Sequence, residues 1–184
     1  VYIVIVTVTD SGSNTDSQTI TVTVTDVNES APVITSNSGG STASISFAEN
    51  NTAAVTTVTS TDADGTSTAT YSISGGADAA DFAINGSSGV LTFASTPNSE
   101  SAADADTNNE YIIIVQVTDG TNTDSQTITI SVTDVNEFTP SITSNGGGDA
   151  ATTSDFSENN TAAVTTVTSS DSDYASTATY SISG

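Results

Sequence analysis

The stretch Gln126-Thr-Ile-Thr-Ile-Ser-Val-Thr-Asp-Val-Asn-Glu137 combines a strand pattern with the start of a linker. Its apolar residues Ile128, Ile130 and Val132 alternate with hydroxyl side chains, which is typical of a strand with one buried face. The last four residues, Asp134–Glu137, carry acidic and amide oxygens. The stretch therefore predicts a half-buried strand that ends in an oxygen-rich junction.

Other segments of the chain are repeated. Three pairs of segments match at an offset of 108 or 109 residues: Tyr2–Asp10 with Tyr111–Asp119, Asp16–Ile20 with Asp124–Ile128, and Phe47–Val58 with Phe156–Val167. A fixed period of this kind indicates a tandem array of one structural unit. We predict the end of one module at 1–26, a complete module at 27–136 and the start of a third at 137–184, in a chain taken from a longer array.

Strand signals recur about every ten residues in the complete module, separated by Gly, Asn, Asp and Ser clusters. The predicted strands are Val33–Ser36, Ile45–Ala48, Ala54–Ser60, Ala69–Ser74, Phe82–Ile84, Val90–Phe93, Tyr111–Thr118 and Gln126–Thr133. No segment has helical periodicity. This pattern predicts an all-β fold of two packed sheets with Greek-key connections.

The composition excludes several function classes. The 184 residues include 22 Asp and Glu but no Lys, Arg, His or Cys, so the net charge is −22. Such a chain repels nucleic-acid backbones and anionic membrane surfaces, and no apolar run approaches the roughly 20 residues of a membrane span. The usual nucleophile activators and general bases are absent, so we predict no enzyme activity.

Carboxylates gather where modules meet, and the chain has no basic side chain to neutralise them. The pairs Asp62/Asp64 and Asp171/Asp173 direct two carboxylates to one side of a turn, which is costly unless a cation lies between them. Calcium binds six to eight oxygens from such groups. A single loop of this type is equally explained as a solvated turn, but its repetition beside an acidic linker favours calcium.

Together these motifs resemble the cadherin-like repeats of large bacterial surface proteins, within the cadherin superfamily. The matching motifs are Phe47–Asn50, Asp62–Gly65, Tyr71–Gly76, Gly89–Phe93, Val117–Gly120 and Asp134–Glu137. The resemblance covers nearly the whole chain. It implies tandem Ig-like Greek-key β-sandwich modules of the cadherin type, with calcium ions between consecutive modules.

The resemblance also implies the calcium ligands. At the second junction these are Glu49, Glu100, Asp134, Asn136, Glu137, Asp171 and Asp173. At the first junction they are Asp26, Asn28, Glu29, Asp62, Asp64 and Asp119, while Asp10 and Glu158 map to junctions outside these residues. The chain departs from the family at Asn98, where an Asp is common, and at Phe138–Pro140, where the eukaryotic linker carries a second Asp-Asn pair.

Two features leave alternatives open. Asp104, Asp106 and Asn108 offer oxygens at alternating positions, so they predict either a further calcium loop or a hydrophilic surface loop. Ile112 and Ile114 lie on the strand face opposite the predicted core. We expect a crossing loop of the same module to cover that face; otherwise it is an apolar patch for a neighbouring chain.

We predict a calcium-rigidified repeat of an extracellular, cell-surface adhesin or fibre, acting as a stiff spacer that supports adhesion. Its partners would be adjacent modules of the same chain and homotypic or lateral contacts between chains. A second hypothesis makes the chain a subunit of an ordered extracellular filament, in which packing between chains is primary and calcium secondary. A third, direct recognition of glycans or of another module, is disfavoured for glycans by the absence of Trp and only ten Tyr and Phe together.

Overall fold

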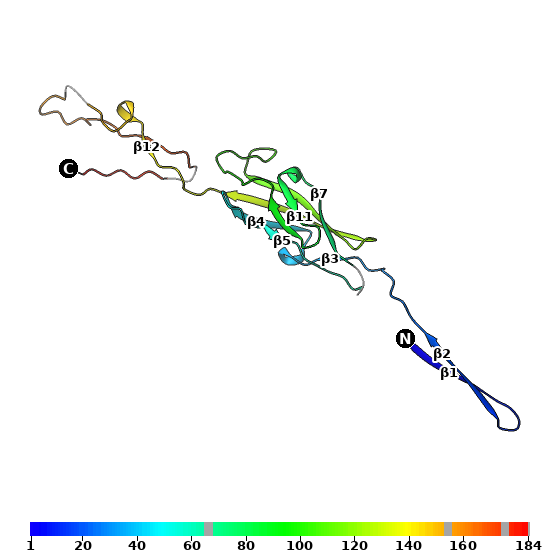
Figure 1. Cartoon of the computed structure of the whole chain (residues 1–184). Coiled ribbons are helices and arrows are strands. Elements are labelled where there is room, and N and C mark those ends of the chain that lie inside the picture. Colours follow the sequence, from blue (N-terminus) through cyan, green and yellow to red (C-terminus); the bar gives the residue numbers. More distant parts are fainter. Residues whose placement is uncertain (65–67, 153–155, 174–176, 184) are drawn as a thin grey trace.

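The computed structural model of the chain describes residues 1–64, 68–152, 156–173 and 177–183. Gly65 of the Asp62–Gly65 motif and Gly184 of the third predicted module lie outside these residues. A central sandwich lies between a two-stranded hairpin at the N-terminal end and an extended segment at the C-terminal end (Figure 1). The two chain ends are therefore on opposite sides of the sandwich.

The larger sheet of the sandwich has four strands in the order β4-β11-β10-β7. Their bounds are Thr42–Ala48 for β4, Thr123–Thr133 for β11, Glu110–Thr118 for β10 and Thr70–Gly75 for β7. Strand β11 runs antiparallel to β10 and parallel to β4. The alternating stretch Gln126–Thr133 therefore lies in one of the two central strands of this sheet.

The opposite layer consists of shorter strands in two groups. Strands β3 (Val33–Ile34) and β6 (Ser60–Thr61) pair with each other, and β9 (Val90–Phe93) lies between β5 (Thr56–Thr57) and β8 (Phe82–Ile84). The two layers confirm the predicted all-β, Ig-like sandwich.

Residues from both layers form one hydrophobic core. On β10, the side chains of Tyr111, Ile113, Val115 and Val117 are at most 1% exposed. An aromatic group adds to the core, with ring centroids 4.3 Å apart for Phe82 and Phe93 and 5.1 Å for Phe93 and Tyr111. The side of β10 predicted to be buried is thus the core side, as the period-two pattern requires.

Some strand predictions were wrong at their ends. The predicted strand Ala54–Ser60 is divided into β5 and β6, because the chain moves from one partner strand to another around the buried Val58. Among the described residues, helical structure is limited to three short 3-10 turns, Asn37–Gly39, Ala79–Asp81 and Ser144–Gly146. These turns have no apolar period from which they could have been predicted.

The outer face of β10 also differs from the prediction. Ile112 is 42% exposed and Ile114 is half-buried, so the loop expected to cover this face does not cover Ile112. Across the strand pair, Ile112 faces Thr129 and Ile114 faces Thr127. Uncharged side chains thus lie opposite both isoleucines, and Ile112 is open to solvent.

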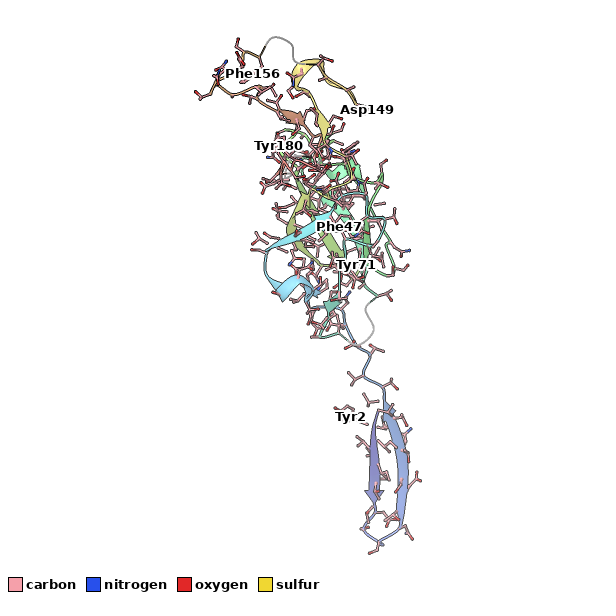
Figure 2. The ribbon with its side chains drawn as sticks, turned by 90° about the vertical axis from the view of Figure 1, so that its left-hand side faces the viewer. Tyr2, Phe47, Tyr71, Asp149, Phe156 and Tyr180 are labelled. Carbon is pink, nitrogen blue, oxygen red and sulfur yellow. The ribbon has the colours of Figure 1, made fainter. Side chains whose placement is uncertain are left out.

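The two end segments repeat parts of the sandwich. The hairpin of β1 (Tyr2–Thr9) and β2 (Thr15–Val22) matches β10 and β11 in sequence, and the pair β12 (Ser141–Ile142) and β13 (Ser169–Ser170) matches β3 and β6. Figure 2 shows Phe47 within the sandwich and its sequence equivalent Phe156 at the far end; they are 6% and 45% exposed. The module boundaries at residues 26 and 136 remain predictions.

Candidate metal centre

Glu49 is the most deeply buried acidic residue at the second junction, with 2% of its surface exposed. It directly follows β4, and its backbone N–H donates to the carbonyl of Thr133 (3.0 Å). Its Oε2 accepts a hydrogen bond from the N–H of Ser99 (2.7 Å), and its Oε1 accepts one from the N–H of Val135 (2.7 Å). One carboxylate thus joins the end of β4, the loop after β9 and the linker.

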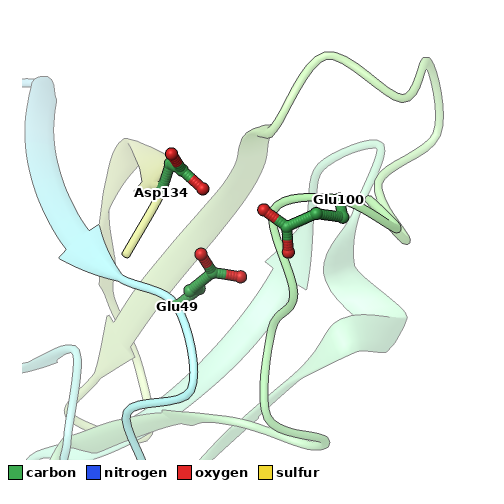
Figure 3. Close-up of side chains that lie close together, drawn as sticks. All are labelled: Glu49, Glu100 and Asp134. Carbon is green, nitrogen blue, oxygen red and sulfur yellow. The ribbon is translucent and has the colours of Figure 1, made fainter. Parts of the chain in front are cut away.

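Two further carboxylates lie beside Glu49. Glu100 comes from the loop between β9 and β10, and Asp134 directly follows β11 (Figure 3). Each of the three residues has a carboxylate oxygen within 4.8 Å of the corresponding oxygens of the other two. The fold therefore brings together three of the seven predicted ligands of the second junction.

The environment of Glu100 is unfavourable for a negative charge. Both of its carboxylate oxygens are buried, and neither accepts a hydrogen bond from the described residues. Burial, followed by the neighbouring carboxyls of Asp134 and Glu49, raises the pKa of Glu100 from 4.5 to about 7. A divalent cation would remove both penalties, so this donor set fits calcium.

Asn98 replaces the acidic residue that the family commonly has two positions before the Glu. Its Oδ1 accepts a hydrogen bond from the N–H of Ser101 (2.8 Å) and so closes the turn that carries Glu100. The amide therefore has a local structural role in this turn.

The remaining predicted ligands of the second junction surround the linker. Asp173 is 5% exposed, and its carboxylate accepts hydrogen bonds from the backbone N–H groups of Glu137 (3.3 Å) and Phe138 (3.0 Å). The Oε2 of Glu137 accepts one from the Asn50 amide (2.8 Å), which ties the linker back to the central module. Asn136 and Asp171 line one cavity of about 820 Å³.

At the first junction, the predicted ligands contact the linker in a similar way. Asp64 is 9% exposed, and its Oδ2 accepts a hydrogen bond from the N–H of Ser30 (2.7 Å). Asp62 accepts from the N–H of Asp64 (3.0 Å). Asp26 and Glu29 are exposed on the same linker. The second Asp of the downstream Asp-x-Asp pair thus accepts hydrogen bonds from the linker backbone at both junctions.

Asn28 and Asp119 complete the first junction. With its nitrogen toward the acids, the Asn28 amide donates to Asp119 Oδ2 (3.0 Å) and Asp64 Oδ2 (3.2 Å). With its oxygen toward them, three oxygens converge, which is the arrangement a cation requires. The hydrogen bond from the N–H of Asn122 is the largest effect that lowers the pKa of Asp119, so this carboxyl is readily ionised and can act as a negatively charged metal ligand.

The loop of Asp104, Asp106 and Asn108 is closed by its own hydrogen bonds. Asp104 is 4% exposed and accepts from the N–H groups of Asn108 (2.8 Å) and Asn109 (3.2 Å). Asp106 accepts from the Asn108 side chain (2.9 Å). Backbone donors satisfy this loop, which favours the surface-loop alternative.

Sequence reasoning missed two residues that hold the loop between β9 and β10. Asp78 is 4% exposed, and its carboxylate accepts from the N–H groups of Ala105 (2.7 Å) and Ile112 (2.7 Å). Asn109 has a positive φ of 65° and donates to the carbonyl of Ser99 (2.9 Å). The sequence shows only that Asn tolerates a positive φ, and this preference does not predict that Asn109 binds the Ser99 carbonyl.

Comparisons with known proteins identify the family of the central part of the chain. Residues 43–133 match the family model of the cadherin domain. Residues 43–133 form a cadherin domain. Among curated proteins, no sequence matches the chain.

Several solved cadherin structures are similar to the chain. A protocadherin gammaB7 structure of repeats EC3-6, described as a cis-dimer, is 26% identical with a TM-score of 0.63, and the match covers 94% of this chain and 42% of that one. Mouse cadherin-23 EC22-24 is 20% identical with a TM-score of 0.54, covering 76% and 44%. The human desmocollin-1 ectodomain is 24% identical with a TM-score of 0.52, covering 74% and 26%. The chain thus spans less than half the length of these structures.

None of the helices formed by the described residues has the length and apolar character needed to cross a membrane.

Proposed function

We propose that the chain is a calcium-stiffened repeat of an extracellular adhesion protein, in which it serves as a spacer between other parts of the molecule. Cadherin-type modules are adhesion modules, and the role of this chain is non-catalytic and at the cell surface, of the kind played by large bacterial adhesins. Its partners are the adjacent modules of the same chain and, laterally, other copies. The protocadherin gammaB7 relative is described as a cis-dimer.

The observation that carries the proposal is the group of Glu49, Glu100 and Asp134. Three carboxylates within 4.8 Å of one another repel in the absence of a cation, and the chain has no basic side chain to compensate. Glu49 is already positioned by two backbone N–H groups, while the oxygens of Glu100 lack hydrogen-bond donors among the described residues. These features suit an ion that binds carboxylate oxygens directly.

The same residues explain how binding would stiffen the junction. Glu49, Glu100 and Asp134 would hold an ion on the upstream side, and the linker residues Asn136 and Glu137 follow Asp134 directly. Asp171 and Asp173 would approach from the downstream side, where Asp173 already holds the linker backbone. Calcium would supply positive charge that both sides share, and the carboxylates would orient the linker between them.

Small-angle X-ray scattering of the chain with calcium and with chelator tests this function. We expect the distribution of interatomic distances to broaden on chelation. The carboxylates at each junction then repel one another, and the junction becomes a flexible hinge. The double variant E49Q/E100Q should resemble the chelated wild type even with calcium, whereas E110Q, which removes an exposed carboxylate outside the group, should not. Equal scattering with and without calcium would refute the spacer function.

A second candidate is the ordered extracellular filament, and the outer face of β10 favours it. Ile112 is exposed there and is paired with Thr129, so this face offers an apolar contact to a neighbouring copy. Bundles that persist in chelator, and that disappear in I112S, would favour this function. Bundles that require calcium would favour the spacer.

A further inference from the structure

The turn that carries Glu100 is held on two sides, by the predicted ligand Glu49 and by Asn109, which is outside the predicted ligand set. The peptide of Ser99 directly precedes Glu100, and Ser99 is 5% exposed. Its N–H donates to Glu49 Oε2 (2.7 Å), and its carbonyl accepts from the side-chain amide of Asn109 (2.9 Å). The position of Glu100 therefore depends on Asn109 as well as on Glu49.

Asn109 also contacts the strand that leads to Asp134. Its backbone carbonyl accepts a hydrogen bond from the N–H of Val132 (2.9 Å), two residues before Asp134. Its backbone N–H donates to Asp104 Oδ1 (3.2 Å), and its φ of 65° lies in the left-handed region. One residue thus connects the turn of Glu100 with the end of β11.

The side-chain oxygen of Asn109 lacks a hydrogen-bond donor within the part of the chain that the structure describes, which is a second and independent feature of this residue. This Oδ1 is buried and accepts no hydrogen bond from the described residues. Asn109 lines a cavity of about 690 Å³, which Glu100 and Asp134 also line. A buried amide oxygen without a donor is costly, and a water molecule bound to a cation in this cavity would supply one.

We propose that Asn109 is a positioning residue for calcium at the group of Glu49, Glu100 and Asp134. Its Nδ2 donates to the Ser99 carbonyl, and its Oδ1 would accept a hydrogen bond from a water molecule bound to the ion. This inference rests on the proposed calcium function but assigns a role to a residue outside the ligand set. Loss of such a supporting contact lowers metal affinity by about tenfold or more.

The variants follow from the backbone conformation. Asn109→Gly removes both side-chain contacts and tolerates the positive φ. Asn109→Ser is a second choice, since Ser13 and Ser38 adopt φ values of 68° and 71° in this chain. Thr107→Gly is the matched control, because Thr107 lies in the same loop with a φ of 58°. It separates loop flexibility from the contacts of Asn109.

The assay is a calcium titration of the whole ¹⁵N-labelled chain by NMR. The N–H groups of Ser99 and Val135 donate to Glu49 and report on the second junction. Those of Thr121 and Asn122 donate to Asp119 (2.6 Å each) and report on the first. We expect Asn109→Gly and Asn109→Ser to raise the midpoint at Ser99 and Val135 about tenfold and to leave the first-junction midpoint unchanged.

The outcomes separate the two proposals. If the wild-type signals of Ser99 and Val135 do not respond to calcium, the proposed function itself fails. If they respond but both Asn109 variants have the wild-type midpoint, the role of Asn109 is refuted. An equal rise in Thr107→Gly would also refute it, because loop flexibility would then account for the effect.

Discussion

The substitution Glu100→Gln should change the stability of the central module in opposite directions with and without calcium. One carboxylate oxygen from each of Glu49, Glu100 and Asp134 lies within 4.8 Å of the other two. At that distance, each charged pair repels by roughly 1 kcal/mol in water and about 3.5 kcal/mol at an effective dielectric constant of 20. Removing the charge of Glu100 relieves two such pairs, so we expect the calcium-free module to gain about 2 kcal/mol or more.

With calcium the effect reverses, because the variant lacks one charged ligand. A tenfold loss of affinity lowers the calcium-dependent stabilisation by about 1.4 kcal/mol when calcium is well above the dissociation constant. All three residues belong to the central module, so its own unfolding reports the change. Urea unfolding followed by circular dichroism, in chelator and in calcium at pH 8, measures both values.

The control is Glu110→Gln, which removes an exposed carboxylate at the start of β10. This variant should show the same calcium-dependent stabilisation as the wild type. The reasoning fails if Glu100→Gln destabilises the calcium-free module, or if calcium stabilises it as much as it stabilises the wild type.

Three further predictions follow from the structure. The pKa of Glu100 is raised from 4.5 to about 7. Protonation of Glu100 therefore stabilises the calcium-free fold fully below pH 4.5, and this contribution is lost as the pH rises to about 7. The difference in unfolding free energy between wild type and E100Q, measured in chelator across this pH range, should change in the same way. Gln126 is fully buried and donates to the carbonyl of Gly40 (2.7 Å), so Q126L should cost about 1–3 kcal/mol in urea unfolding; a loss below 0.5 kcal/mol, about the size of a surface substitution, would contradict this role. Gly89 has a φ of 70°, and a Cβ there would overlap the carbonyl oxygen of Val58, so G89A should lower the free energy of unfolding by about 2–4 kcal/mol. A Cβ at Gly120 meets nothing, so G120A should lower it by about 1 kcal/mol or less. Equal melting temperatures of the two variants would refute this distinction.

Much of the sandwich could be predicted because its signals are local. The strands Phe82–Ile84 and Val90–Phe93 have the predicted bounds, and the alternation in β11 correctly separates its buried and outer residues. The division between β5 and β6 could not be predicted, because it depends on which strand each half pairs with. The exposure of Ile112 likewise depends on where a distant loop lies.

The candidate site was predictable in its chemistry and only partly in its geometry. The resemblance to cadherin-like repeats named Glu49, Glu100 and Asp134 among the ligands, and the fold brings these three together. The contacts that hold Ser99 between Glu49 and Asn109 have no sequence signature. They join residues that are neighbours only after the loop between β9 and β10 has closed.

The amino-acid sequence by itself determined the repeat period, the alternating strands, and the supply of oxygen ligands without any basic residue to compete for them. These properties are local or compositional, so they can be read before the chain folds. Only the tertiary structure decided which carboxylates meet and which amides support them. Pairing β4 in parallel with β11 brings Glu49 beside Asp134, and closure of the loop after β9 adds Glu100. Such contacts arise from sheet register and loop closure between residues far apart in the chain, and these are properties of the whole fold.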